Sequence, residues 1–216
     1  QSRAVLRRTC RHSVRYIKAW QGEDGIRNVI PRAGRNSEFP EMPSFHPGIV
    51  LEEIIKGRPV CEVGCGYGRL AGSFNFDSYI GVDINVDAIT RAKNTFPAHS
   101  FHVIHEYRYP PSMTKFAYTV CMHVPDDEYP LMIEAMCEST GDQIVIAEIL
   151  GEHLRKPITR TFNGAVSHAT FGRSQIAHEN EFMKNGWSLV TYHQRPYPGK
   201  GTFTFLDFRK GFDNAA

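Results

Sequence analysis

The sequence predicts an α/β fold in which short apolar strands alternate with amphipathic helices. The first observation is an apolar strand that runs into a loop with three glycines, Gly64, Gly66 and Gly68. The second is another apolar strand, which ends in Asp83. The third is the succession of strand and helix patterns that follows it. Together they indicate one α/β domain built around a glycine-rich loop.

The glycine loop suits a nucleotide-type cofactor. Glycine has no Cβ, so it permits a tight strand-to-helix turn and a close approach of the backbone to a ligand. The helix expected after the loop would add free N–H groups and a positive dipole end. Arg69 stands where the dinucleotide fingerprint Gly-x-Gly-x-x-Gly requires glycine, which argues against a nicotinamide cofactor. Asp83 is placed to accept hydrogen bonds from two ribose hydroxyls.

The pattern Glu62-x-Gly64-x-Gly66-x-Gly68, followed by Gly81-Val82-Asp83-Ile84-Asn85 and a helix, resembles the class I S-adenosylmethionine (SAM)-dependent methyltransferases. The resemblance extends from about residue 51 to 208 and implies a seven-stranded, mostly parallel, doubly wound sheet that binds SAM. The alternative is an ordinary strand-turn-helix without a ligand. Carried over position by position, the resemblance implies these cofactor-binding residues: Glu62, Gly64, Cys65, Gly66, Gly68, Asp83, Ile84, Glu106 and Met122.

Length and composition fit one domain with an N-terminal addition. A chain of 216 residues can bury a substantial α/β core. We expect a basic helix and lid segment at 1–48 and a methyltransferase domain at 49–212. No apolar run approaches the roughly 20 residues that span a bilayer, and no secretory leader is visible. We therefore expect a cytoplasmic protein that does not bind membranes. Gln1 leaves two alternatives, a processed product or a piece of a longer, multidomain polypeptide.

The five cysteines include no Cys-x-x-Cys pair, so neither a disulfide framework nor a zinc site is predicted.

The first twenty residues predict an amphipathic basic helix that ends near Gly22. Its basic face could contact nucleic acid, a membrane surface or an acidic partner. We favour a solvated face on a helix that packs over the cofactor site, because the net charge of the chain is only +2. Nucleic acid is not an expected partner.

The segment 22–47 is rich in glycine and proline, and a loop this long predicts a lid over the substrate pocket. Arg35 lies in it. In related enzymes the segment before the first strand closes over the cofactor, so Tyr16 and Trp20 are expected to line the substrate site. Core packing is the alternative for both side chains.

The remaining elements follow from apolar periodicity and from capping and stop residues. Asn85 can cap a helix with Asp87 in its first turn, Gly141 is expected to end the helix that residues 123–128 open, and Gly186 ends the last helix. We expect helices at 44–57, after Gly68, at 86–96, at 123–140 and at 174–185, and strands at 60–63, 80–83, 100–104, 116–122, 143–149, 187–192 and 202–208.

The loop 105–110 falls where the family contacts adenine. The family commonly has Asp followed by a small residue there, whereas this chain has His105 and Glu106. The place of the adenine contact is therefore expected, but the identity of the contacting residue stays open.

His123 is the first candidate for a catalytic base. It follows the fourth strand, where an open parallel sheet has its ligand crevice, and small-molecule methyltransferases have a similar His-Val-Pro-Asp start at this point. Glu148 ends the fifth strand at the same edge, and the polar insertion 151–173, which holds His153 and His168, is expected to form much of the acceptor pocket. The candidates, in order, are His123, His168, His153 and Glu148, and a structural or substrate-orienting role is the alternative for each.

Three consecutive acids, Asp126, Asp127 and Glu128, raise the possibility of a metal site, since hard cations prefer carboxylates. A helix dipole explains acids in a first helical turn equally well. We predict no metal.

The predicted reaction is methylation of a hydroxyl on a small polar acceptor such as a sugar or glycan. Histidine, asparagine, arginine and aromatic side chains are expected around the pocket, which suits such an acceptor. The Asn-Pro-Pro-Tyr signature of base and glutamine N-methylation is absent, because Cys-Met-His-Val stands at 121–124. N-methylation of a small-molecule amine, a noncatalytic cofactor-binding or partner-binding module, and an RNA-binding methyltransferase-like domain are the alternatives.

Overall fold

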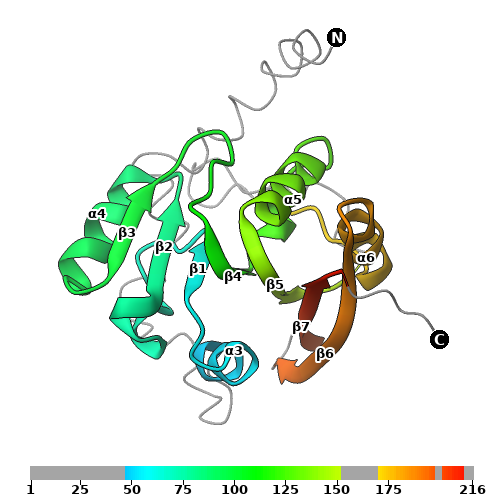
Figure 1. Cartoon of the computed structure of the whole chain (residues 1–216), viewed down its shortest axis with the longest axis horizontal. Helices are drawn as coiled ribbons and strands as arrows, with labels where there is room; N and C mark the ends of the chain where they lie inside the picture. The colour runs from blue at the N-terminus through cyan, green and yellow to red at the C-terminus, as the bar shows by residue number, and fades with distance from the viewer. Residues whose placement is uncertain (1–46, 152–169, 198–200, 212–216) are drawn as a thin grey trace, which may run out of the picture.

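The computed structural model describes residues 47–151, 170–197 and 201–211. Its centre is one seven-stranded sheet with the order β3-β2-β1-β4-β5-β7-β6 (Figure 1). β7 runs antiparallel to both of its neighbours, and the four other strand pairs are parallel. The predicted seven-stranded, mostly parallel sheet is confirmed. The strands are β1 (Val60–Val63), β2 (Tyr79–Asp83), β3 (Ser100–Val103), β4 (Ser112–Tyr118), β5 (Thr140–Ile149), β6 (Trp187–Tyr197) and β7 (Gly201–Lys210).

Helices cover both faces of this sheet, as a doubly wound fold requires (Figure 1). Alternate residues of the central strands enter two separate apolar clusters. In β5, for example, Val145 belongs to the cluster that contains α3 and α4, whereas Ile146 belongs to the cluster that contains α5 and α6. The helices are α3 (Pro47–Ile55), α4 (Val86–Thr95), α5 (Tyr129–Glu138) and α6 (Gln175–Lys184).

Helix ends agree with the capping residues in the sequence. The side chain of Asn85 accepts hydrogen bonds from the backbone N–H groups of Asp87 and Ala88, at 3.0 and 2.9 Å, and starts α4. Ser174 caps α6 through the N–H of Ala177 at 3.2 Å, and Gly186 follows that helix with a φ of 76°. These boundaries are confirmed.

The helix expected after the glycine loop is wrong. Residues 64–78, all of which the structure describes, contain turns and two single-turn 3₁₀ helices, η1 (Ala71–Ser73) and η2 (Phe76–Ser78). Glycine, serine and asparagine weaken an α-helix here, and the side chain of Asn75 caps η2 by accepting from the N–H of Asp77. The ring of Phe74 packs against Tyr79 and Phe116, which brings the chain back to the sheet without a helix. The helix dipole that was expected directly after this loop is therefore missing.

Further boundaries differ from the prediction: β4 begins at Ser112 and α5 begins at Tyr129. β4 ends at Tyr118, because Thr119 takes a φ of 55°, and Cys121–His123 forms a 3₁₀ helix, η3. α5 ends at Glu138, because the hydroxyls of Ser139 and Thr140 donate to backbone carbonyls one turn back. Gly141 consequently lies within β5 rather than at a helix end. β6 is longer than expected and reaches residue 197.

Several expectations fall outside the described residues. They are the basic helix, the lid, the interior of the insertion, and the side chains of Tyr16, Trp20, Arg35, His153 and His168. The division at residue 48 stays a prediction. No helix in the described part of the chain is long and apolar enough to cross a membrane.

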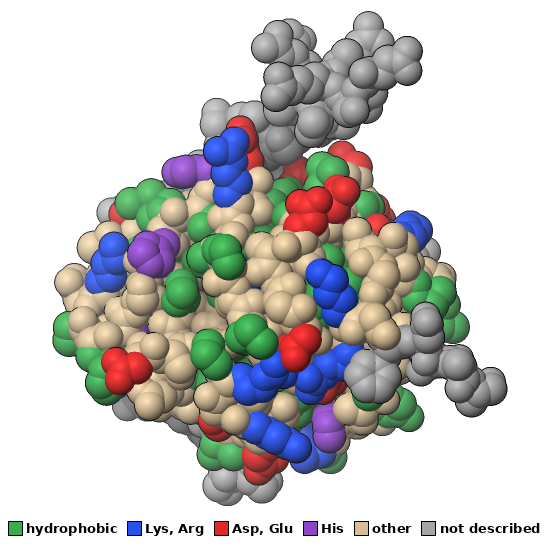
Figure 2. Space-filling view, in the orientation of Figure 1, with side chains coloured by type: hydrophobic (Ala, Val, Ile, Leu, Met, Phe, Trp, Pro, Cys, Tyr) green, Lys and Arg blue, Asp and Glu red, His purple; other side chains and the backbone are tan. Residues whose placement is uncertain are grey.

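The face seen in Figure 2 carries charges of both signs. Lys and Arg side chains are interspersed with Asp and Glu, although a group of Lys and Arg gathers near its lower edge. Several cations of the described residues are paired, including Arg58 with Asp142 and Arg209 with Asp207. This face is therefore mixed in charge, with one local group of basic side chains.

The cysteines of the described residues, Cys61, Cys65, Cys121 and Cys137, are free and buried. Burial raises the pKa of the Cys61 thiol to about 12, so this thiol stays protonated and unreactive.

Lys115 gives the fold a pH dependence. This fully buried lysine of β4 donates to the Ser112 hydroxyl at 3.0 Å and the Ser139 carbonyl at 2.6 Å, and burial lowers its pKa from 10.5 to about 8. Between pH 8 and 10.5 the unfolded chain binds more protons at this residue than the folded chain. Its contribution to the free energy of unfolding should therefore rise with pH across this window, by up to about 1.4 kcal/mol per pH unit.

Urea unfolding of the wild type and of Lys115→Met at pH 7.5, 9 and 10.5 measures this effect. The difference between the two proteins should change with pH, whereas the exposed Lys93→Met control should show a constant difference. A pH-independent difference for Lys115→Met would contradict the assignment.

Candidate functional site

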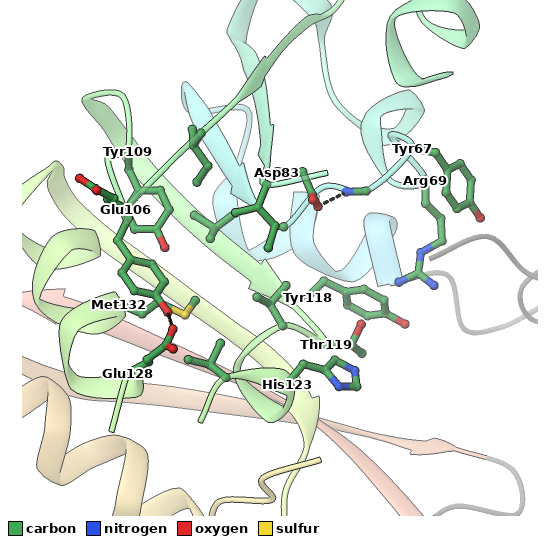
Figure 3. Close-up of a pocket in the computed structure, with 18 residues that line it drawn as sticks. Tyr67, Arg69, Asp83, Glu106, Tyr109, Tyr118, Thr119, His123, Glu128 and Met132 are labelled. Carbon is green, nitrogen blue, oxygen red and sulfur yellow. Dashed lines mark hydrogen bonds between the residues drawn. The ribbon is translucent and has the colours of Figure 1, made fainter. Parts of the chain in front are cut away.

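A cavity of about 250 Å³ lies where the carboxyl ends of β1, β2 and β4 meet. This is the edge at which open parallel sheets bind ligands. Figure 3 shows three groups of residues around it: the glycine loop with Asp83, an apolar and aromatic wall, and a polar end that contains His123.

The glycine loop folds back over the end of β2. The N–H groups of Gly64 and Cys65 both donate to the carbonyl of Val82, at 2.8 and 3.0 Å. Gly64, Gly66 and Gly68 have φ values of 72°, 54° and 80°, which glycine adopts without strain. Gly64 and Gly66 line the cavity, so backbone rather than side chains forms this wall.

Asp83 is held by the same loop. Its Oδ2 accepts from the N–H of Gly66 and its Oδ1 from the N–H of Asn85, both at 2.8 Å (Figure 3 shows the first bond). Burial raises its pKa above the usual 3.8, and these backbone donors oppose the rise. Each carboxylate oxygen can accept a further hydrogen bond. The residue thus presents two oriented acceptors to the cavity, which matches a vicinal diol.

The apolar wall comes from two segments far apart in the sequence. Ile104, Tyr107 and Tyr109 follow β3, and Met132 belongs to α5. The hydroxyl of Tyr107 donates to the carboxylate of Glu128 at 2.5 Å, which ties the two segments together (Figure 3). The result is a largely apolar slot with a few polar atoms, which suits a flat heteroaromatic ring.

Glu106 lines this part of the cavity, as expected from its position in the loop 105–110. Glu106 and Tyr107 have φ values of 54° and 55°, left-handed conformations that turn the loop sharply after β3. Sequence reasoning missed the tyrosines. The Tyr107-x-Tyr109 alternation directly after a strand end was the available signal.

The polar end of the cavity holds His123 together with Tyr67, Arg69, Tyr118 and Thr119 (Figure 3). The guanidinium carbon of Arg69 lies 4.6 Å from the centroid of the Tyr118 ring, a cation–π arrangement. His123 thus shares one cavity with the glycine loop and Asp83. Aromatic and hydrogen-bonding side chains at this end suit a polar acceptor, and Arg69 already places a positive charge there.

Five residues expected at the site do not line the cavity and instead support its walls from behind: Glu62, Cys65, Gly68, Met122 and Glu148. Glu62 is buried and accepts a hydrogen bond from the hydroxyl of Tyr79. Cys65 is buried against Gly81, and a Cβ on Gly68 would meet the rings of Phe101 and Phe96. Strand and turn residues alternate in direction, which explains why only some residues of the motif reach the ligand side.

Glu148 is 1% exposed and bonds to the backbone of Met122. It does not reach the cavity, so the geometry suits it to a positioning role rather than to proton transfer.

The three consecutive acids lie before α5, with Glu128 at its N-cap position, so their predicted placement in the first helical turn is wrong. Asp126 pairs with Arg173 at 2.8 Å, and Glu128 accepts from Tyr107. No group of three or more potential metal ligands occurs among the described residues. These contacts account for Asp126 and Glu128.

Gly64→Ala should damage the site more than the fold. A Cβ at Gly64 would lie 2.4 Å from Cγ2 of Val120, another lining residue, and the φ of 72° adds strain. Gly186→Ala is a matched control, because its φ is 76° but its Cβ would meet nothing within 4 Å. Both variants should lose about 1–2 kcal/mol of stability from the left-handed conformation.

Only Gly64→Ala should also lower the affinity for SAM, at least tenfold, as measured by calorimetry. Equal affinities of the two variants would show that the close approach of the loop to Val120 is not needed for binding.

No protein-family model matches the chain, and no curated protein matches it either. Solved structures do match. Magnesium protoporphyrin IX methyltransferase from Synechocystis PCC 6803, with bound S-adenosylhomocysteine (SAH), aligns at 18% identity and a TM-score of 0.57, over 75% of this chain and 78% of that one. A SAM-dependent methyltransferase from Methanosarcina mazei aligns at 14% identity and a TM-score of 0.65, over 78% and 99% of the two chains.

These identities are too low to transfer an activity. The structural matches nevertheless agree with the strand order, with the antiparallel β7 and with a cavity at the carboxyl edge. The chain has the fold of the class I SAM-dependent methyltransferases.

Proposed function

We propose that this protein is a SAM-dependent methyltransferase. One observation carries the proposal. A single cavity is lined by the glycine loop, the two carboxylate oxygens of Asp83, an apolar slot and His123. Similar solved structures support it, since the Synechocystis enzyme was solved with SAM and with SAH, and human N-acetylserotonin methyltransferase was solved with SAM.

The residues present fit this cofactor. Asp83 would accept hydrogen bonds from the two ribose hydroxyls, and the slot between Ile104 and Met132 would hold the adenine ring. The backbone at Gly64 would lie along the methionine moiety, where a Cβ would force Val120 to move. When bound, SAM supplies a methyl group on a positively charged sulfur.

His123 is our proposed base for the transfer. A neutral hydroxyl is a poor nucleophile, so its proton must leave as the bond from oxygen to the methyl carbon forms and the bond from carbon to sulfur breaks. The imidazole of His123 would accept that proton at the polar end of the cavity. The cavity walls would align the acceptor and exclude water from the reactive sulfonium.

The proposed acceptor is a small molecule with a hydroxyl group, such as a sugar or glycan. The side chains of Tyr67, Arg69, Tyr118 and Thr119 beside His123 combine ring faces with hydrogen-bonding groups, which suits a hydroxyl-rich molecule. Similar structures include a mitomycin 7-O-methyltransferase and an enzyme of echinomycin biosynthesis, which supports a small acceptor. A small-molecule amine is the competing acceptor.

Calorimetry with SAM and SAH tests the cofactor, and absence of binding would overturn the proposal. A screen with methyl-labelled SAM against sugars, other hydroxyl compounds, amines and RNA tests the acceptor. Transfer to amines alone would keep the methyltransferase and reject the hydroxyl acceptor. Binding of SAM without transfer to any acceptor class would favour a noncatalytic cofactor-binding module.

A further inference from the structure

A chain of buried polar side chains runs behind the wall of the cavity. The hydroxyl of Tyr129 lies 2.6 Å from Nδ1 of His178, and Nε2 of His178 lies 2.9 Å from Oε1 of Glu148. The other carboxylate oxygen, Oε2 of Glu148, accepts from the backbone N–H of Met122 at 2.9 Å. The three side chains are 4%, 0% and 1% exposed, so water does not compete for these contacts.

The chemistry of these groups sets the direction of the bonds. An ionised carboxylate repels the lone pair of a bare ring nitrogen, so Nε2 of His178 carries the hydrogen at this 2.9 Å contact, although its N–H does not align with Oε1 of Glu148 as in a regular hydrogen bond. In the neutral ring, Nδ1 then accepts from the hydroxyl of Tyr129. The contacts of Glu148 thus select one tautomer of His178 and link α5, α6 and β5 to the turn at Met122.

Arg173 holds the same turn from its other side. Its Nη1 donates to the carbonyl of Cys121 at 2.6 Å, and its Nη2 donates to the carbonyl of Val124 at 2.8 Å. Its guanidinium lies 4.0 Å from the ring centroid of Tyr129, which joins it to the chain described above. The backbone N–H of Phe171 donates to the carbonyl of Met122 at 2.7 Å.

The backbone on both sides of His123 is therefore fastened from two other elements. Glu148 and Phe171 bind the two backbone groups of Met122, and Arg173 bridges Cys121 and Val124. Burial of charged groups is costly, and apolar packing would stabilise the fold at least as well. What such a network supplies is a defined geometry for the turn that it encloses.

We propose that the network of Glu148, His178, Tyr129 and Arg173 positions the turn Cys121–Val124, and through it the imidazole of His123, at the polar end of the cavity. These four are positioning residues. The inference rests on the proposed function, because the purpose of the positioning is alignment of His123 with the methyl group. A misplacement of about 1 Å can cost about a hundredfold in rate, so this degree of constraint matters.

Glu148→Gln is the first test. The amide can still accept from Met122, but then its NH₂ group faces Nε2 of His178, and the ring must move its hydrogen to Nδ1. Nitrogen NMR of labelled histidine should show Nε2–H in the wild type and Nδ1–H in the variant. Asp207→Asn is the matched control, since Asp207 is also a buried carboxylate with two side-chain partners, Gln143 and Arg209, and does not line the cavity. It should leave the tautomer unchanged.

Arg173→Lys is the second test. A lysine keeps the charge but cannot bridge two carbonyls as a planar guanidinium does. Addition of SAH should shift the ring resonances of His123 in the wild type, and this shift should fall at least twofold in Arg173→Lys. Arg58→Lys is the matched control, because the guanidinium of Arg58 donates through Nη2 to the carboxylate of Asp142 and through Nη1 to Gln143, away from the cavity. It should leave the shift intact.

Three outcomes are informative. An unchanged tautomer in Glu148→Gln, or an unchanged His123 response in Arg173→Lys, would overturn the network. Equal effects of the variants and their matched controls would also overturn it, because a general loss of stability would then explain the data. If the wild type does not bind SAH, the proposed function fails, yet the tautomer comparison without ligand still decides whether the network holds.

Discussion

Asp83→Asn is expected to weaken SAM binding at least about a hundredfold, with the fold retained. The carboxylate would accept hydrogen bonds from two ribose hydroxyls, and bonds to charged acceptors contribute about 1.5–3 kcal/mol each. The amide offers one acceptor atom instead of two, and in either orientation its NH₂ group would face a backbone N–H donor, that of Gly66 or that of Asn85. A loss of about 3 kcal/mol corresponds to slightly more than a hundredfold in affinity.

Calorimetry with SAM measures this effect, and thermal unfolding without ligand checks the fold. Asp87→Asn is the control, because Asp87 lies on the exposed side of α4 and does not line the cavity. It removes the same charge and should leave the affinity within threefold. An Asp83→Asn protein that binds SAM as tightly as the wild type would show that the diol acceptor is another group.

The pH dependence of binding should also identify Asp83. Burial raises its pKa above 3.8, and the ribose hydroxyls need the ionised carboxylate as acceptor. SAM affinity should therefore fall as the pH drops through this raised pKa, and Asp83→Asn should lack this decrease. For stability without ligand the sign is opposite, because the folded state holds the proton more tightly than the unfolded state, and the contribution of Asp83 is lost as the pH rises through the folded pKa.

His123→Ala is expected to lower turnover at least a hundredfold while SAM affinity changes little. A general base contributes about 10²–10⁴-fold to such a reaction, and His123 is the titratable side chain beside Tyr118 and Thr119 at the polar end of the cavity. Its loss removes the proton acceptor but leaves Asp83 and the glycine loop in place. Turnover is measured with the hydroxyl acceptor that the labelled-SAM screen identifies.

His193→Ala on β6 is the control, because this histidine does not line the cavity. It should leave turnover unchanged. Unchanged turnover in His123→Ala would remove His123 from the mechanism, and loss of SAM binding in this variant would assign it to the cofactor instead. An amine acceptor that enters as the free base would not need His123, so a small effect with an amine and a large effect with a hydroxyl would identify the acceptor class.

Local signals predicted most of the fold correctly. Asn85 caps α4 through its own side chain, and Gly186 ends α6 in the left-handed region, so both boundaries follow from residues next to each other in the chain. The failure after Gly68 has a tertiary cause as well as a local one. The burial of Phe74 against Tyr79 and Phe116 competes with helix formation, and no spacing in the sequence reveals that contact.

The candidate site likewise contains residues that the sequence predicted and residues that only the tertiary structure revealed. The glycine spacing and the acid at the end of the second strand predicted Gly64, Gly66 and Asp83, which do line the cavity. Tyr107 and Glu128 were not predicted to act together, because twenty residues separate them and only the packing of α5 against the loop after β3 joins their side chains. Glu148 was expected at the crevice, but its side chain points to His178 and Met122.

The sequence by itself determined the α/β class, the order of the strands along the chain and the loop that faces the ligand. These depend on periodicity, capping and glycine conformations, which act over a few residues. The tertiary structure decided which side chains reach the cavity and which support it, because burial and hydrogen bonding between distant segments set side-chain direction. It also showed that the turn at His123 is held by Glu148 and Arg173, two residues from elements that follow it in the chain.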